Sequence, residues 1–170
     1  MQDAFVQSPA LAGVPADFDF IFGRWNVHHR RLRHRLQACE EWISFEGRSE
    51  FRPLMGGQGN VDDNWLDLPG EPYRAATLRA YDPKTQQWAI WWLDGRYPDR
   101  IDTPMRGSFD SQDGIGLFLA DDTFEGRPIR VRFIWTARGP NQGPRWEQAF
   151  SEDGGASWET NWVMNFERAD

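Results

Sequence analysis

The sequence predicts an all-β protein, a single up-and-down antiparallel β-barrel of about nine or ten strands with a short N-terminal helical turn. Clusters of Gly, Pro, Asn and Asp, such as YDPKTQQW and SQDGIG, recur at the spacing typical of short antiparallel strands. After the first turn, no segment shows a helical period over the length a helix needs. A chain of short strands leaves unpaired edges, and closing into a barrel removes them.

The length of 170 residues suits one domain with its own core. We expect residues 1–16 to form a flexible leader, because Pro9, Gly13 and Pro15 occur there without periodicity, and residues 17–170 to form the barrel domain. Cys39 is the single cysteine, so no internal disulfide can form. The N-terminal segment has neither the basic start nor the apolar run of a signal peptide, and we expect a cytoplasmic location.

The composition points to a small-molecule ligand rather than to nucleic acid or membrane. A formal net charge of -7 disfavours phosphate-dominated binding, and no window is apolar enough to span a bilayer. Ten tryptophans are shared across almost every segment, and they must cover a core or line a cavity. The sequence leaves a homodimer open.

Alternation of apolar and polar residues identifies the covered face of some strands. In the segment 129–136, the apolar set Val131, Phe133 and Trp135 alternates with Arg130, Arg132 and Ile134. The segment 87–94, QWAIWWLD, is apolar on both faces, so its orientation stays open between two sets: Trp88, Ile90, Trp92 and Asp94, or Ala89, Trp91 and Leu93. Just before the first strand, Asp17 is placed to cap the short helical turn.

The two ends of the predicted barrel carry a motif: Gly23, Arg24 and Trp25 in FIFGRWNV, and Arg168 at the end of VMNFER. This pairing resembles the calycin superfamily, which includes lipocalins, fatty-acid-binding proteins and avidins, and in which a basic residue of the last strand packs over the tryptophan of Gly-X-Trp. Such a cation–π contact, worth roughly 0.5 to 2 kcal/mol, would join the first strand to the last. The chain from about residue 17 also resembles a bacterial family of lipocalin-like barrels catalogued as a domain of unknown function, which implies a fold and no activity. The glycine-rich haem pattern of the related nitrobindin barrels is not evident, so no cofactor is expected.

If Trp25 and Arg168 point inward, alternation assigns the other inward residues of three strands. The inward set is Val27, His29, Arg31 and Arg33 in the first strand, Trp146, Gln148 and Phe150 in the segment 145–151, and Trp158, Thr160, Trp162, Met164 and Phe166 in the last strand. The outward set of the last strand is Glu159, Asn161, Asn165 and Glu167. The register between the last two strands is uncertain by one residue, unless a bulge absorbs it.

The leading hypothesis is a ligand-binding barrel with an aromatic-lined cavity for an apolar or aromatic ligand, which Arg31 could hold by an anionic group. The predicted ligand-binding residues are His29, Arg31, Trp92, Trp135, Trp146, Gln148, Phe150, Trp162 and Met164. One alternative is an enzyme of the same fold, an isomerase, cyclase, hydratase or hydrolase, with His29 as acid or base. The other is a structural or protein-interaction module.

Four further features of the sequence each have their own interpretation. The basic run HHRRLRHR at 28–35 fits the wet end of a long strand, a nucleic-acid patch or an anion site with His29 and Arg31. No metal is expected, because His28 and His29 face opposite sides of a strand and His34 shares only the face of His28. Asp62, Asp63, Asp94, Asp121 and Asp122 are expected in or beside turns, where one could act as an acid or base. Ser151, Asp153, Gly155, Ser157 and Trp158 fit an Asp-box pattern, which we interpret as hairpin-turn chemistry.

Overall fold

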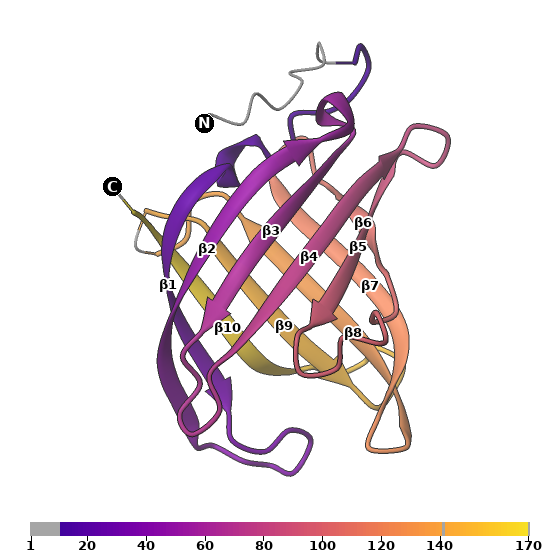
Figure 1. Cartoon of the computed structure of the whole chain (residues 1–170). Helices are drawn as coiled ribbons and strands as arrows, with labels where there is room; N and C mark the ends of the chain where they lie inside the picture. Colours follow the sequence, from indigo (N-terminus) through magenta and orange to yellow (C-terminus); the bar gives the residue numbers. More distant parts are fainter. Residues whose placement is uncertain (1–10, 141, 170) are drawn as a thin grey trace.

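A computed structural model of the chain describes residues 11–140 and 142–169. It shows a closed barrel in which each strand pairs with its sequence neighbours and the first strand pairs with the last (Figure 1). The prediction of an all-β, up-and-down antiparallel barrel is confirmed. The elements are η1 (Asp19–Ile21), β1 (Gly23–Leu32), β2 (Trp42–Leu54), η2 (Met55–Gly57), β3 (Gly59–Leu66), β4 (Tyr73–Asp82), β5 (Gln87–Asp94), β6 (Met105–Phe109), β7 (Ile115–Phe124), β8 (Arg127–Thr136), β9 (Arg145–Ser151) and β10 (Glu159–Arg168).

The helical segments η1 and η2 are three-residue turns, and the described part of the chain contains no helix with the length and hydrophobicity to cross a membrane. The leader predicted for residues 1–16 falls in large part on residues 1–10, which lie outside the described residues.

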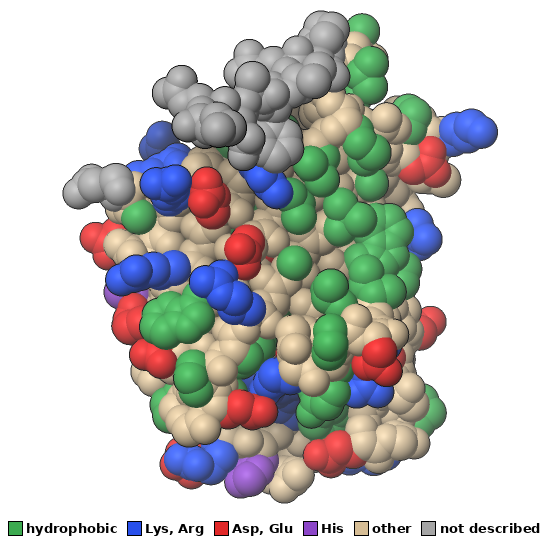
Figure 2. All heavy atoms as spheres, in the orientation of Figure 1, with side chains coloured by type: hydrophobic (Ala, Val, Ile, Leu, Met, Phe, Trp, Pro, Cys, Tyr) green, Lys and Arg blue, Asp and Glu red, His purple; other side chains and the backbone are tan. Residues whose placement is uncertain are grey.

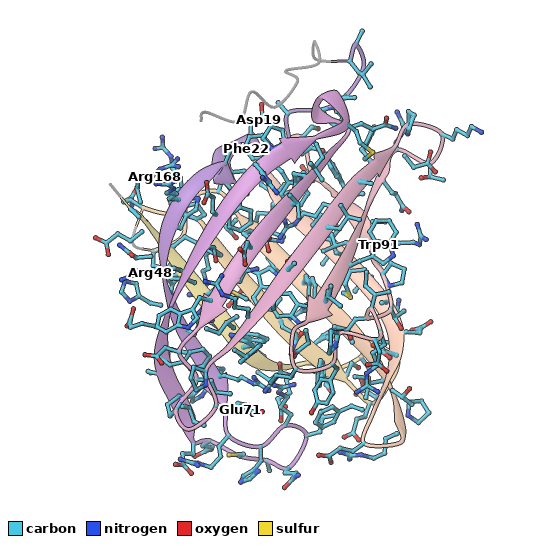
Figure 3. All side chains as sticks on the ribbon, in the orientation of Figure 1. Asp19, Phe22, Arg48, Glu71, Trp91 and Arg168 are labelled. Carbon is cyan, nitrogen blue, oxygen red and sulfur yellow. The ribbon has the colours of Figure 1, made fainter. Side chains whose placement is uncertain are left out.

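The first and last strands close the barrel through the predicted contact. Trp25 lies opposite Arg168 in the β1–β10 register, and the guanidinium carbon of Arg168 is 3.9 Å from the centre of the Trp25 ring. Arg168 Nη1 also donates to the carbonyl oxygen of Phe22 at 2.6 Å, and both residues lie at the same end of the barrel in Figure 3. Gly23 has a positive φ of 111°, and a β-carbon there would collide with the Arg168 side chain. The glycine, the tryptophan and the arginine therefore form one structural latch.

The end of the barrel near η1 is plugged by aromatic residues. Phe18 and Ile21 are fully buried, and the Phe18 ring packs edge to face on Trp88 at 5.0 Å and on Phe109 at 4.9 Å. The prediction that Asp17 caps the helical turn is wrong, because no side chain caps η1. Asp17 instead accepts a hydrogen bond of 2.9 Å from the indole Nε1 of Trp88, which ties the plug to β5.

Buried and more exposed side chains alternate along β1, except at its last residue. Trp25, Val27 and His29 are buried, whereas the side chains between them are exposed. The inward assignment of Arg33 is wrong, because β1 ends at Leu32 and Arg33 is exposed, with Nε 2.8 Å from Glu41 Oε1. In β5 the open choice is resolved in favour of the set Trp88, Ile90, Trp92 and Asp94, of which the first two are buried and the last three line the interior cavity.

A β-bulge in β10 absorbs the residue that made the last hairpin ambiguous. The register with β9 shifts between Thr160 and Trp162, and the extra residue, Asn161, is fully buried rather than outward as predicted. Asn161 Oδ1 accepts a hydrogen bond of 2.9 Å from Gln148 Nε2. Alternation reverses before the bulge, so Glu159 pairs with the inward Phe150. The inward assignments of Trp158 and Thr160 and the outward assignment of Glu159 are therefore wrong.

The turn between β9 and β10 has the predicted hairpin chemistry. Asp153 accepts hydrogen bonds from the Ser157 hydroxyl at 2.6 Å and from the Ser157 backbone N–H at 2.9 Å, and the Ser151 hydroxyl donates to it at 2.7 Å. These bonds hold the pKa of Asp153 below its usual range. Trp158 lies under Arg132, whose guanidinium carbon is 4.5 Å from the ring centre. This Asp-box residue set builds the turn and touches no cavity.

Candidate functional site

The interior of the barrel contains a cavity of about 690 Å³. Its wall includes Arg35 of the β1–β2 loop, residues 100–103 of the β5–β6 loop, and Asp122 to Glu125 at the β7–β8 turn. These three connections lie at the end of the barrel opposite η1, so the cavity opens there and is closed at the other end (Figure 1). The volume is within the range of about 300 to 1,000 Å³ that is typical of small-molecule sites. We call the open end the mouth.

Three tryptophans meet inside the cavity. Trp92 of β5 and Trp162 of β10 stand on opposite sides of the barrel, and their ring centres are 6.1 Å apart with an interplanar angle of 85°. Trp146 of β9 packs on Trp162 in the same edge-to-face manner, with ring centres 5.5 Å apart. This arrangement offers an apolar body both ring faces and ring edges, and it is fixed by contacts across the whole lumen.

His29 lies behind this aromatic wall and is not among the residues that line the cavity. Its Nδ1 accepts a hydrogen bond of 3.2 Å from Trp162 Nε1, and its ring stacks on Phe45 with centres 4.6 Å apart. Burial, followed by the charges of Arg31 and His28, lowers the pKa of His29 to about 3. His29 is therefore neutral near pH 7 and positions Trp162.

Two arginines stand at the mouth without a carboxylate partner. Arg31 lies directly opposite Trp162 in the strand register, and its guanidinium carbon is 5.0 Å from the Trp162 ring centre. Arg35 lies over Phe124 and Phe150 at 5.9 and 5.8 Å. Burial lowers the pKa of both arginines. The pKa of Arg35 falls to about 10, and the nearby positive charge of Arg31 contributes to this fall. Among residues 11–140 and 142–169, neither guanidinium has an acidic group within ion-pair distance.

A second set of charges at the mouth, near Arg31, is compensated. Arg96 Nη2 is 2.8 Å from Asp94 Oδ2, its Nη1 is 3.1 Å from Glu71 Oε2, and its guanidinium carbon stacks 3.8 Å from the Tyr73 ring centre. The hydrogen bond with Asp94 raises the pKa of Arg96. Asp102 also lines the cavity, and burial, followed by the charges of Asp122 and Asp94, raises its pKa.

The closed end of the cavity has a buried ion pair at its floor. Arg79 Nη2 is 2.7 Å from Asp62 Oδ2, and both side chains are at most 3% exposed. Asp62 also accepts from the Thr77 backbone N–H at 3.0 Å and from the Asn64 side chain. The Arg79 guanidinium lies 5.2 to 5.5 Å from the ring centres of Phe18, Phe51 and Trp135. The prediction that Asp62 and Asp63 lie in or beside turns is wrong, since both lie inside β3.

The cavity brings together eight of the nine residues that the sequence predicts for a ligand site. Arg31, Trp92, Trp135, Trp146, Gln148, Phe150, Trp162 and Met164 line it, whereas His29 does not. Sequence reasoning missed Arg35, Tyr73, Asp102 and Phe124. Only the basic run at 28–35 pointed to Arg35, which lies in a loop that the strand period does not place. In the described part of the chain, no three His, Cys, Asp or Glu side chains gather in a way that could hold a metal ion.

The fold and the site define a closed ten-stranded β-barrel with an aromatic-walled cavity that opens at one end. No protein-family model matches the chain, and a search of curated proteins finds no match either. The resemblance to calycins therefore stays an expectation from the motif at the two ends of the chain.

Proposed function

We propose that this protein binds an apolar or aromatic small molecule inside the barrel. The observation that carries the proposal is the cavity itself: three tryptophans that contact one another across the lumen line a space of about 690 Å³, which is large enough for a ligand. The polar and charged residues of the lining lie mainly at the mouth and at the Arg79–Asp62 floor, so the aromatic wall between them suits an apolar body that polar contacts orient.

A neutral fluorescent probe tests this proposal. We expect phenylnaphthylamine to quench tryptophan emission on titration, and Trp92→Ala to weaken its binding by about tenfold, which corresponds to about 1.4 kcal/mol. Trp91→Ala is the matched control, because Trp91 precedes Trp92 in β5 and points to the outer surface (Figure 3). Absence of binding to the wild-type chain would overturn the proposal, and so would equal weakening by both substitutions.

The Trp91→Ala control also tests the alternative that the protein is an interaction module. Hydrophobic side chains gather on the outer face of β4 and β5 (Figure 2), where Leu78 pairs with Trp91 and Ala76 pairs with Leu93. If Trp91→Ala weakens probe binding and Trp92→Ala does not, the probe binds this outer surface. That result would favour a protein-interaction role over a cavity ligand.

An enzyme of the same fold is the second candidate, and one observation favours it. Asp102 is a cavity-lining carboxyl group whose pKa is raised, which is the direction that favours its protonated, proton-donating form. His29 does not suit this role, because it lies behind the wall and its Nδ1 is occupied by Trp162. Asp102→Asn should lower turnover of any substrate that is found by about 100-fold or more while leaving binding within about twofold. Equal loss of binding and turnover would argue against catalysis by Asp102.

A further inference from the structure

Five arginines line the interior and mouth of the barrel. One of them, Arg100, is exposed, and the other four divide into two kinds. Arg79 and Arg96 each have a carboxylate at 2.7 to 2.8 Å, whereas Arg31 and Arg35 have none among the described residues. Glu159, whose charge acts on Arg35, accepts the Leu36 backbone N–H with both oxygens, at 2.8 and 3.1 Å, and it makes no ion pair with Arg35. Within residues 11–140 and 142–169, Arg31 and Arg35 therefore have no ion-pair partner, although Arg31 forms a hydrogen bond with Tyr73.

The two unpaired guanidinium groups are held in place rather than free to move into solvent. Trp162 lies under Arg31, and Phe124 and Phe150 lie beside Arg35. One nitrogen of Arg31, Nη1, is buried and has no hydrogen-bond partner. A buried donor without a partner is costly and uncommon, and it usually indicates a missing ligand or water.

The loop between β1 and β2 is built to keep Arg35 at this position. The Arg33 backbone N–H donates to the Glu41 carbonyl oxygen at 2.9 Å, and the Arg33 and Glu41 side chains form an ion pair. Leu36 and Ala38 adopt positive φ angles of 57° and 51°, which are uncommon for residues other than glycine.

We propose that Arg31 and Arg35 together bind the single anionic group of an amphiphilic ligand, whose apolar or aromatic body lies in the tryptophan-lined cavity. This inference rests on the proposed function and names its ligand class: an organic monoanion, such as a carboxylic or sulfonic acid, with its acid group at the mouth. Two guanidinium forks around one site suit the planar, bidentate recognition of such a group.

The remaining charges at the mouth limit the ligand to one negative charge. Asp94, Asp102 and Asp122 line the same cavity, and the charge of Asp94 reaches Arg31. A polyanion that reached past Arg31 and Arg35 would meet these carboxylates and be repelled. The site thus favours a monoanion over a nucleotide or another multiply charged ligand.

A matched pair of probes separates this inference from the proposed function. Anilinonaphthalene sulfonate is a monoanion with nearly the same aromatic body as the neutral phenylnaphthylamine. We expect the wild-type chain to bind the sulfonate at least about tenfold more tightly than the neutral probe, and Arg35→Gln and Arg31→Gln to remove most of that difference. Binding of the neutral probe should stay within about threefold in both variants, which also shows that they fold.

Arg30→Gln is the matched control, because Arg30 lies in the same basic run, next to Arg31, and its exposed side chain lies over Trp42, 5.0 Å from the ring centre. It should leave the affinities for both probes unchanged. Raising the salt concentration from about 20 to about 500 mM should weaken binding of the sulfonate to the wild-type chain and leave binding of the neutral probe unchanged. This measurement needs no variant.

The outcomes are distinguishable. The anion site is overturned, and the proposed function stands, if the wild-type chain binds the neutral probe as tightly as the sulfonate. The same holds if Arg35→Gln still binds the sulfonate more tightly than the neutral probe by the wild-type factor. If neither probe binds the wild-type chain, both the proposed function and the anion site are overturned.

Discussion

Arg79 at the closed end of the barrel and the pair Arg31 and Arg35 at the mouth are held in opposite ways. At the closed end, Arg79 has a carboxylate partner, an amide partner and three aromatic neighbours, and it lies beneath the η1 plug. At the mouth, Arg31 and Arg35 have aromatic neighbours and no carboxylate within ion-pair distance in the described ranges. The aromatic environment is similar at both ends, so the counter-ion is what distinguishes a structural arginine from one available to a ligand.

The largest effect should come from breaking the buried pair at the closed end. Arg79→Met leaves the Asp62 carboxylate buried without its partner, and we expect a loss of about 3 to 5 kcal/mol in the free energy of unfolding, measured by urea denaturation. The double substitution Asp62→Leu with Arg79→Met should recover much of this loss, because no buried charge then remains. If Arg79→Met lowers the free energy of unfolding by no more than Arg35→Gln does, the proposed difference between the two ends is wrong.

His29 belongs to neither of the two arginine sites compared above. It should make the stability of the fold depend on pH. Its pKa of about 3 in the fold lies below the ordinary 6.5, so its contribution to stability is complete above pH 6.5 and is lost as the pH falls toward 3. We expect the wild-type chain to lose up to about 1.4 kcal/mol more per pH unit between about pH 6 and pH 4 than His29→Gln does. Urea titrations at several pH values measure this difference, and parallel pH profiles would show that His29 titrates normally.

The mouth should respond to the loss of an arginine in the opposite direction from the closed end. Arg35→Gln removes a positive charge that lies near Arg31, so the free energy of unfolding should stay the same or rise by up to about 1 kcal/mol while anion binding is lost. Thermal denaturation of the ligand-free variant measures this change. A loss above about 2 kcal/mol would mean that Arg35 is held there for stability.

The smallest effect is expected on the outer surface. His28 Nδ1 is 2.7 Å from Glu46 and Nε2 is 3.3 Å from Glu167, and hydrogen bonds to these two carboxylates raise the pKa of His28. Its contribution to stability is therefore present below pH 6.5 and disappears as the pH rises through the raised pKa. His28→Gln should cost no more than a few tenths of a kcal/mol at pH 6 and nothing at pH 9, because the cluster is solvent-exposed. A larger cost at pH 9 than at pH 6 would contradict this assignment.

The sequence predicts those parts of this molecule that follow a local period. Alternation places Trp146, Gln148 and Phe150 on the cavity wall, and the motif at the chain ends predicts the latch of Arg168 on Trp25. The bulge at Asn161 has no signal of its own, because an extra residue in a strand leaves the composition unchanged and shifts every residue before it.

Other features depend on contacts between segments far apart in the chain. Arg35 and Asp102 lie in loops, whose course over the mouth is set by tertiary contacts such as that of Glu159 with Leu36. The sequence places Asp62 in or beside a turn because Asp commonly hydrogen-bonds the backbone there. Its partner Arg79 lies on the next strand, and only the β3–β4 pairing brings the two side chains together. His29 illustrates the same limit, since alternation places it inward but cannot tell a cavity wall from the layer behind it.

The most direct test of the account is a crystal structure of the chain with anilinonaphthalene sulfonate bound. We predict the naphthalene body beside Trp92 and Trp162, and the sulfonate oxygens within charge-assisted hydrogen-bond distance, about 2.7 to 2.9 Å, of both Arg31 and Arg35. A probe bound instead on the outer face of β4 and β5, with the cavity lacking it, would contradict the account.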